Sequence, residues 1–343
     1  MLRIQDTGYR IQVLKKETRF LFCLSTVYCL LSTCSWADFL PKNAFSNKAR
    51  GTTAASFLKI AASARASALA DSIALGPNDP LGGFGMPAAY ASNSQRKHLA
   101  LASGILPENI VQTAVTAGIP YRANAKLAFS VHQIIQPSLT LYDNLGSNVG
   151  EFRPTDTAIG AGYAASAKEI RWGFSLFYLY SKIGPSLSGS GVSSNFGLHL
   201  PYDYFEDPNL SLGLAVVNFG PPAKWGSRST PLPMKAQAQA GYKLGALTFL
   251  NLDLALPADQ APYGIASLEW KIPLGTTDAA LTEASGNGFS VRLGITSKNK
   301  TDSVTDKLSF GLGLALGKAV VDASFASFGN LGFFPRLGLN LAF

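Results

Sequence analysis

The chain after residue 37 lacks any run of roughly 18 consecutive apolar residues, so membrane-spanning helices are excluded. Charged residues are also scarce: they make up 15% of the chain, whereas soluble domains carry about 25%. Hydrophobic residues nevertheless make up 47% of the sequence. A high apolar content without helical runs indicates strands whose side chains alternate in polarity.

Cysteine and histidine are equally sparse. The three cysteines all lie before residue 38, which leaves the rest of the chain without disulfides. His98, His132 and His199 stand apart, with no metal-ligand spacing and no catalytic partner motif. We therefore expect ordinary wall histidines, no metal, no cofactor and no enzymatic activity. No basic block interleaved with aromatic residues is present either, which argues against a nucleic-acid partner.

The first 37 residues are typical of an export signal. Basic residues precede an uncharged apolar run over 20–33, and Ser35-Trp36-Ala37 supplies small residues at the cleavage positions. We predict a cleaved signal peptide over 1–37. Two alternatives stay open: an uncleaved anchor, and a lipoprotein modified at Cys34, although Thr33 suits that poorly. The lead-in before Lys15 is long, so a later start codon is a further alternative.

Alternation of apolar and small or polar residues begins at His98. It predicts fourteen strands: 98–104, 109–118, 125–134, 155–166, 170–181, 190–200, 209–218, 233–243, 246–256, 262–271, 288–296, 306–317, 319–326 and 334–343. An even number of strands suits a bacterial single-chain barrel. The alternative is a soluble β-sandwich, but the faces opposite the apolar ones carry Gly, Ala and Ser instead of charge. We therefore predict an all-β protein, a 14-stranded antiparallel transmembrane barrel over 98–343 that lies in the cell outer membrane.

The final strand carries the clearest signal. One face of this strand consists of apolar residues, Leu337, Leu339, Leu341 and Phe343. The opposite face consists of Arg336, Gly338, Asn340 and Ala342. An apolar-out, polar-in strand with a terminal aromatic residue is typical of a chain that closes a barrel in a membrane. We expect this face to contact outer-membrane lipid and to be the signal that the barrel-assembly machinery recognises.

Connections between the predicted strands differ in length. The short turns 243–245 and 317–318 are typical of hairpins on the periplasmic side. Longer polar segments without obvious periodicity are predicted as extracellular loops: 136–154, 182–190, 219–232 and 272–287.

Residues 38–97 do not alternate cleanly and are rich in Ala, Ser, Gly and Pro. Small residues allow a backbone to approach the small inward residues of a barrel closely, and fourteen strands enclose more space than such residues fill. We predict an N-terminal plug inside the barrel. A periplasmic tail is the alternative.

Polar residues recur on the predicted inward faces of the later strands. The charged members are Lys235, Asp253, Glu269, Arg292, Asp322 and Arg336, and Gln237, Gln239 and Asn251 accompany them. Because buried charges are costly unless paired, one interpretation is an ion-pair network that braces wall and plug. The other is a polar constriction that lines a solute path.

The sequence also resembles the PorV/PorQ-type outer-membrane barrels and their uncharacterised relatives, within the FadL-like fatty-acid-transporter architecture. The resemblance spans about residues 50–343. The matching stretches are Gly51–Leu58, Ala64-Arg65-Ala66, Met86-Pro87-Ala88, Gly150-Glu151-Phe152, Asp156-Thr157-Ala158-Ile159-Gly160, Val217-Asn218-Phe219-Gly220, Pro231-Leu232-Pro233 and 325–332. Met86 stands where that family usually has Asn.

The resemblance implies two functions. FadL-like barrels pass hydrophobic molecules across the outer membrane through a plug that rearranges. The PorV branch serves as an accessory that holds exported proteins at the cell surface. We therefore expect either hydrophobic ligands or exported proteins as partners, and a mainly structural envelope protein is a third alternative.

Overall fold

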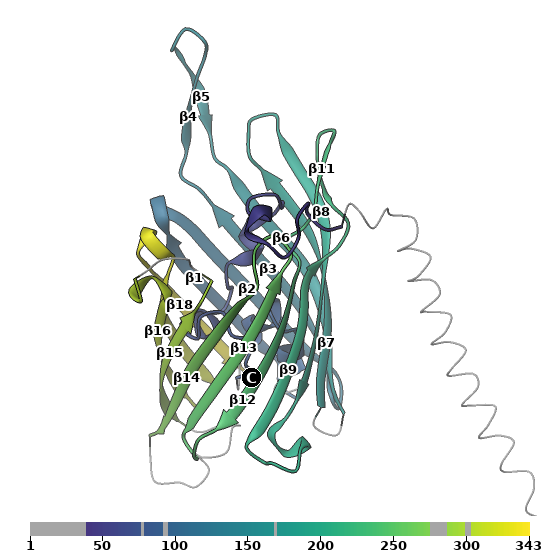
Figure 1. Cartoon of the computed structure of the whole chain (residues 1–343), viewed down its shortest axis with the longest axis vertical. Helices are drawn as coiled ribbons and strands as arrows, with labels where there is room; N and C mark the ends of the chain where they lie inside the picture. Colours follow the sequence, from purple (N-terminus) through teal and green to yellow (C-terminus); the bar gives the residue numbers. More distant parts are fainter. Residues whose placement is uncertain (1–38, 77–78, 92–94, 168–169, 275–286, 299–302) are drawn as a thin grey trace, which may run out of the picture. The chain divides into compact units, whose positions relative to one another are not determined.

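One antiparallel sheet closes on itself to form a barrel (Figure 1). Fourteen strands form the ring, which closes because β1 (His98–Leu106) pairs with β18 (Phe333–Ala342). The other ring strands are β2 (Ile110–Arg122), β3 (Ala125–Ile135), β6 (Thr155–Ala167), β7 (Ile170–Lys182), β8 (Ser188–Leu200), β9 (Leu210–Phe219), β12 (Lys235–Lys243), β13 (Thr248–Pro257), β14 (Tyr263–Pro273), β15 (Gly288–Thr296), β16 (Leu308–Leu316) and β17 (Ala319–Ser327). The predicted fourteen-stranded barrel is confirmed, with strand boundaries that differ by a few residues.

The computed structural model describes residues 39–76, 79–91, 95–167, 170–274, 287–298 and 303–343. The predicted signal peptide over 1–37 lies outside the described residues. Residues 40–343 form one unit. No helix among the described residues is long and apolar enough to cross a membrane.

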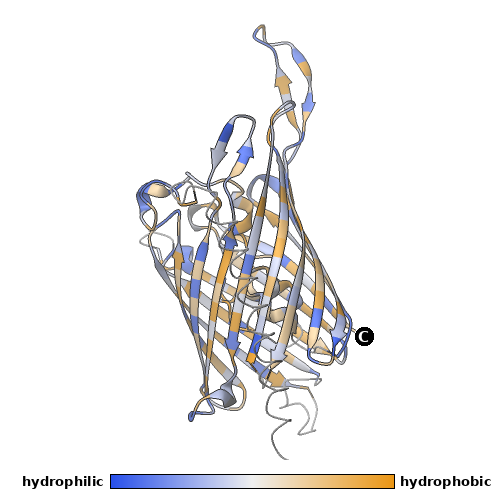
Figure 2. Cartoon of the chain, turned by 90° about the vertical axis from the view of Figure 1, so that its right-hand side faces the viewer, coloured by the Kyte–Doolittle hydropathy of each residue, from blue (hydrophilic) through white to orange (hydrophobic). Residues whose placement is uncertain are grey.

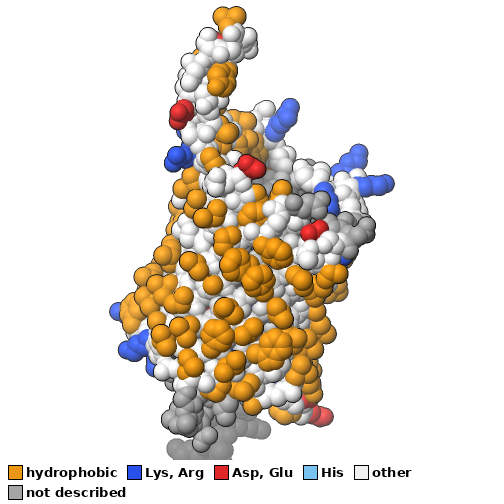
Figure 3. Space-filling model, turned by 90° about the vertical axis from the view of Figure 1, so that its left-hand side faces the viewer, with side chains coloured by type: hydrophobic (Ala, Val, Ile, Leu, Met, Phe, Trp, Pro, Cys, Tyr) orange, Lys and Arg blue, Asp and Glu red, His pale blue; other side chains and the backbone are white. Residues whose placement is uncertain are grey.

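The two faces of each strand differ as the alternation predicts. In β18, Arg336 and Asn340 are buried in the interior, whereas Leu337 and Leu339 lie on the outer surface with 63% and 38% of their area exposed. On β7, Phe174 and Tyr178 also face outward. On the face that Figure 3 shows, hydrophobic side chains cover the outer surface of the barrel, and charged side chains lie beyond this belt toward both ends. A leucine-rich outer face and a polar inner face are what a barrel in lipid requires.

The two ends of the barrel carry different connections. We call the end with the Gly317-Lys318 turn the turn end and the opposite end the loop end. At the loop end, β4 (Leu139–Tyr142) and β5 (Asn148–Phe152) form a protruding hairpin, and β10 (Ala223–Trp225) and β11 (Arg228–Thr230) form a second one next to β8 (Figure 1). Both hairpins lie in segments that we expected to lack strands. Their three to five residues each are too few for an alternating pattern to stand out in the sequence.

The expected placement of segment 272–287 is wrong. It joins β14 to β15, and strand direction puts that connection at the turn end, opposite the other three long segments. The Gly317 amide donates to Oδ1 of Asn287 over 2.8 Å, which fixes the second end of this segment beside the short turn. Residues 275–286 lie outside the described residues. The length and polarity of a loop do not determine the end of the barrel at which it lies. That end follows from the number of strands that precede the loop.

The described residues before β1 fill the barrel interior (Figure 2). Within residues 39–91, the structure describes one short helix, α2 (Ala64–Ala68), and four 3-10 helices, η2 (Asn47–Ala49), η3 (Ser56–Lys59), η4 (Pro80–Phe84) and η5 (Pro87–Ala91). Three further 3-10 turns, η6 (Pro107–Asn109), η9 (Thr305–Lys307) and η10 (Gly329–Leu331), lie at the loop end, and η7 (Tyr202–Tyr204) lies at the turn end. Below we call residues 40–91 the plug, because α2 packs on β15 to β18 and η5 packs on β6 to β8.

Glycines of the wall allow the plug backbone to approach. A Cβ atom on Gly173 of β7 would lie 2.4 Å from the carbonyl oxygen of Pro87, and one on Gly197 of β8 would lie 2.6 Å from the sulfur of Met86. At such distances the neighbouring plug atoms would have to move, which is costly for the Pro87 backbone. The small inward residues of the wall are therefore the surface on which η5 is seated.

Candidate functional site

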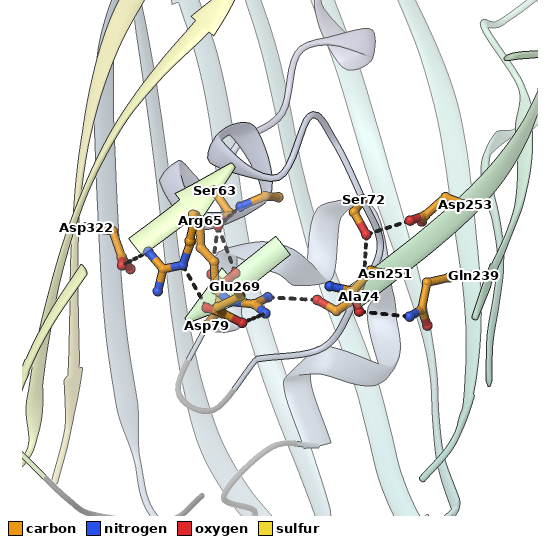
Figure 4. Close-up of polar contacts among 12 residues, drawn as sticks. Ser63, Arg65, Ser72, Ala74, Asp79, Gln239, Asn251, Asp253, Glu269 and Asp322 are labelled. Atoms are coloured by element: carbon orange, nitrogen blue, oxygen red, sulfur yellow. Dashed lines mark hydrogen bonds and ion pairs between the residues drawn. The ribbon is translucent and has the colours of Figure 1, made fainter. Parts of the chain in front are cut away.

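A chain of buried ion pairs joins the plug to the wall. Arg65 of α2 donates from Nε (3.1 Å) and Nη2 (2.7 Å) to the two carboxylate oxygens of Glu269 on β14 (Figure 4). The Nε of Arg292 on β15 reaches the same carboxylate over 2.7 Å, and its Nη1 reaches Asp322 over 2.6 Å. All four side chains are at most 5% exposed. The chain alternates in sign, so each buried charge has an opposite partner.

Strand register and one glycine bring these wall residues together. Glu269 and Arg292 are direct partners across β14 and β15. Arg292 and Asp322 lie two strands apart, and Gly313 of β16 lies between them. A Cβ atom on Gly313 would lie within 2.6 Å of Oδ1 of Asp322 and 2.8 Å of the Arg292 guanidinium. The absence of a side chain at Gly313 thus allows an arginine to span the intervening strand.

The plug side of this contact is equally well bonded. Ser63 caps α2 by accepting from the Ala66 amide, and its hydroxyl donates to both oxygens of Asp79 over 2.9 and 2.8 Å. Burial alone lowers the pKa of Arg65, but the Glu269 carboxylate beside it raises that pKa above its ordinary value. Burial raises the pKa of Asp79 above its ordinary value, against the opposing effect of Arg65.

The other residues of the predicted polar set lie apart from this chain. Asp253 of β13 accepts from Ser72 Oγ (2.7 Å) and from the Ile73 amide (3.0 Å), so it holds the plug by hydrogen bonds. Gln237 also donates to Asp253 over 2.9 Å. Lys235 forms no ion pair with any residue that the structure describes. Gln239 donates to Asn251 over 3.2 Å along the wall.

Arg336 is placed differently again. Its Nη2 donates to Oε1 of Gln112 over 2.5 Å, and it forms no ion pair with the described residues. Of the six charged residues that we predicted, Glu269, Arg292 and Asp322 meet directly, whereas Lys235, Asp253 and Arg336 do not join them. Arg65, which completes the chain, was absent from the predicted set. A lone arginine within an alanine-rich segment was the signal that could have found it.

A cavity of about 100 Å³ lies inside the barrel, largely between plug and wall. Its lining is mainly apolar and includes Leu58, Ile60, Ile73, Leu75, Phe84, Met86, Phe177 and Val217. At the loop end it is bordered by Lys59 and Asp259, which form an ion pair of 2.7 Å. Lys235 and Lys298 also line it. A partly open, mostly apolar space with a few polar groups is typical of a small-molecule site.

The wall beside this cavity contains an irregularity. Ser194 of β8 pairs with Phe219 of β9, but Phe196 pairs with Val216, so two residues of β9 face Asn195 alone. One of the two, Asn218, has a left-handed backbone (φ 58°), and its amide donates to Oδ1 of Asn195 over 2.7 Å. Asn195, Val217 and Asn218 all line the cavity. The cavity therefore reaches the β-bulge between β8 and β9.

No group of three or more metal-ligating side chains occurs among the described residues. The sequence matches no protein-family profile and no curated protein. Solved structures do show a similar barrel.

The toluene transporter TodX of Pseudomonas putida is 9% identical, with a TM-score of 0.51, and the match covers 82% of this chain and 96% of TodX. The toluene transporter TbuX of Ralstonia pickettii is 12% identical (TM-score 0.48; 81% and 96% covered), and a Pseudomonas aeruginosa FadL homologue is 10% identical (TM-score 0.42; 81% and 94% covered). At such identities the likeness is one of fold alone. The chain thus has a barrel fold similar to that of TodX.

Proposed function

We propose that this protein is an outer-membrane channel that passes small hydrophobic molecules through a plugged barrel. The observation that supports this most directly is the mainly apolar cavity between plug and wall. An apolar molecule that enters it leaves water for a hydrocarbon-like surface, which is favourable in proportion to the area buried. The fold shared with the toluene transporter TodX is consistent with such a role.

The proposed path begins at the loop end and ends at the bulge between β8 and β9. The Lys59–Asp259 ion pair lies at the start of this path. At the bulge, the ladder of hydrogen bonds is interrupted opposite Asn195, where cavity and wall meet. A molecule that crossed the wall there would reach the leucine-rich outer surface and the lipid around it. The signal peptide over 1–37, the outer-membrane location and recognition of β18 by the assembly machinery are parts of this proposal.

The absence of cysteine after residue 37 allows a clean test. Cells that produce the protein should take up radiolabelled toluene faster than cells that lack it. In the double variant Asn195→Cys/Asn218→Cys, a bifunctional methanethiosulfonate reagent joins the two strands at the bulge, and uptake should fall to the background rate. A reducing agent should restore uptake. The matched control, Ala102→Cys/Ala114→Cys, joins two directly paired residues of β1 and β2 and should leave uptake unchanged. Equal uptake with and without the protein would refute the proposal.

The β4–β5 hairpin favours a second candidate function, the docking of an exported protein at the cell surface. Its tip residue Leu145 is 90% exposed, and Tyr142 and Val149 are also largely exposed. Among the described strands, β4 and β5 pair only with each other, so each has an outer edge to which a segment of a partner protein can add. Mass spectrometry of the material that co-purifies in mild detergent distinguishes the two candidates. Apolar small molecules support the channel, whereas an exported protein that is lost on deletion of residues 139–152 supports docking.

A further inference from the structure

His132 of β3 is a buried polar group that the proposed path does not yet use. It is 2% exposed and lines the interior cavity. Its ring contacts two plug phenylalanines, with centroid distances of 5.5 Å to both Phe57 and Phe84. Phe84 stacks in turn on Phe177 of the wall at 5.2 Å. One imidazole therefore interrupts an aromatic surface at this part of the cavity.

The hydrogen bonds around Gln112 determine which ring nitrogen of His132 carries the proton. Arg336 has only donors, so the Gln112 atom that it contacts must be the amide oxygen. The Gln112 nitrogen then donates to the Ala61 carbonyl (2.9 Å) and to Nε2 of His132 (2.7 Å). Nε2 must accept, so the proton of the neutral ring resides on Nδ1. A second proton on Nε2 would face the Gln112 amide, a donor opposite a donor.

The Nδ1–H group of His132 has no hydrogen-bond acceptor among the residues that the structure describes. His132 lines the cavity, so a bound molecule that supplies an acceptor atom can form a hydrogen bond with this donor. The hydrogen bonds from Arg336 to Gln112 and from Gln112 to Nε2 keep the proton of the His132 ring on Nδ1. The fold thus presents one unused N–H donor on the imidazole that borders the apolar cavity.

From this geometry, and resting on the proposed channel function, we infer that the cavity binds neutral hydrophobic molecules that carry one acceptor oxygen, such as an aryl ketone, and that His132 donates to that oxygen. A single N–H satisfies one neutral carbonyl. A charged headgroup at this aromatic part of the cavity would have to be desolvated, which is far more costly than desolvation of a ketone. A pure hydrocarbon would leave the donor unpaired.

A pair of isosteric ligands tests the inference. Acetophenone and α-methylstyrene differ in one position, where the carbonyl oxygen of the first is replaced by a methylene group. Binding of each to the full-length protein in mild detergent is measured by headspace gas chromatography, against detergent alone. The change His132→Leu should weaken acetophenone binding roughly five- to tenfold, the ratio that one neutral hydrogen bond produces. It should leave α-methylstyrene binding almost unchanged.

His132→Asn is the matched control, because the side-chain nitrogen of asparagine can take the place of Nδ1. This variant should retain most of the acetophenone preference. If His132→Leu weakens both ligands equally or neither of them, the inference is overturned, although α-methylstyrene binding still supports an apolar-ligand channel. If the wild-type protein binds neither ligand, the channel function fails and the inference fails with it.

Discussion

The Arg65–Glu269 contact makes a prediction about how firmly the plug is held. Among the described residues, Arg65–Glu269 is the only ion pair that joins α2 to the strands of the barrel, and Arg65→Met removes it. Glu269 keeps its 2.7 Å bond to Arg292, and Arg292 keeps Asp322. The wall therefore remains a bonded unit, whereas the plug loses three hydrogen bonds, two to Glu269 and one to the Ala74 carbonyl.

The magnitude follows from the burial of the pair. Removal of one partner from a buried ion pair costs about 3–5 kcal/mol, mostly because the other charge stays behind unpaired. Glu269 is left with one arginine instead of two, so we expect Arg65→Met to lie near the lower limit, about 3 kcal/mol. Glu269→Gln should cost more, because it leaves two buried arginines facing a neutral amide. The double variant restores charge balance, so its cost should be less than the sum of the single costs.

Two measurements check this prediction. Urea unfolding in detergent gives the free energies for a double-mutant cycle of Arg65→Met and Glu269→Gln. Single-channel recording in planar bilayers reports on the plug, and Arg65→Met should open more often than the wild type while the barrel remains folded on an unheated gel. Strictly additive free energies, together with wild-type conductance in Arg65→Met, would refute the idea that this ion pair holds the plug.

Four further outcomes are expected. Arg292→Leu should destabilise the barrel by about 3–5 kcal/mol in urea unfolding, since Glu269 and Asp322 would lose their shared partner. Unchanged stability together with altered permeability would instead indicate that these charges line a solute path. Gly173→Ala should displace η5 and increase trypsin cleavage of the plug, because the new methyl group would lie 2.4 Å from the Pro87 carbonyl, whereas Gly245→Ala, with nothing within 4 Å, should not. Leu339→Arg on the outer face should lower stability in lipid vesicles by about 2–4 kcal/mol, and Leu145→Arg on the hairpin should have no measurable effect. The raised pKa of Asp79 means that the folded protein favours the protonated form of this carboxyl group. The contribution of Asp79 to stability is therefore present at low pH and is lost as the pH rises above 3.8, the ordinary pKa of the group. In urea unfolding, Asp79→Asn should flatten this part of the pH profile of stability.

The barrel was predictable from the sequence because each wall position is decided locally. The alternation of Leu337 and Leu339 with Arg336 and Gly338 assigns the faces of β18 without knowledge of any partner. Pairing of charged side chains between strands is not local. That Arg292 reaches Asp322 depends on the register of three strands and on Gly313 between them. The sequence therefore indicated which side chains face inward and could not indicate which of them meet.

The plug shows the same limit more strongly. Its small residues predict close packing, yet the position of Arg65 beside Glu269 depends on a path through the lumen that has no periodicity. His132 was expected to be an ordinary wall residue. Its unpaired Nδ1 becomes evident only when the Gln112 and Arg336 bonds are in place, and these join residues 20 and 224 positions apart.

The closure of the ring between β1 and β18 has a consequence for how the protein acquires its structure. The seam joins His98 to Ala342, the two extremes of the barrel sequence, and Arg65 meets Glu269 across 204 positions. Contacts of such separation require the chain to lose most of its conformational freedom before they stabilise anything, and this makes folding slow. Until the seam forms, β1 and β18 each present an unpaired edge that can join a foreign strand. The protein is therefore most vulnerable to mispairing during folding, while both strand edges are open, and not after the barrel has closed.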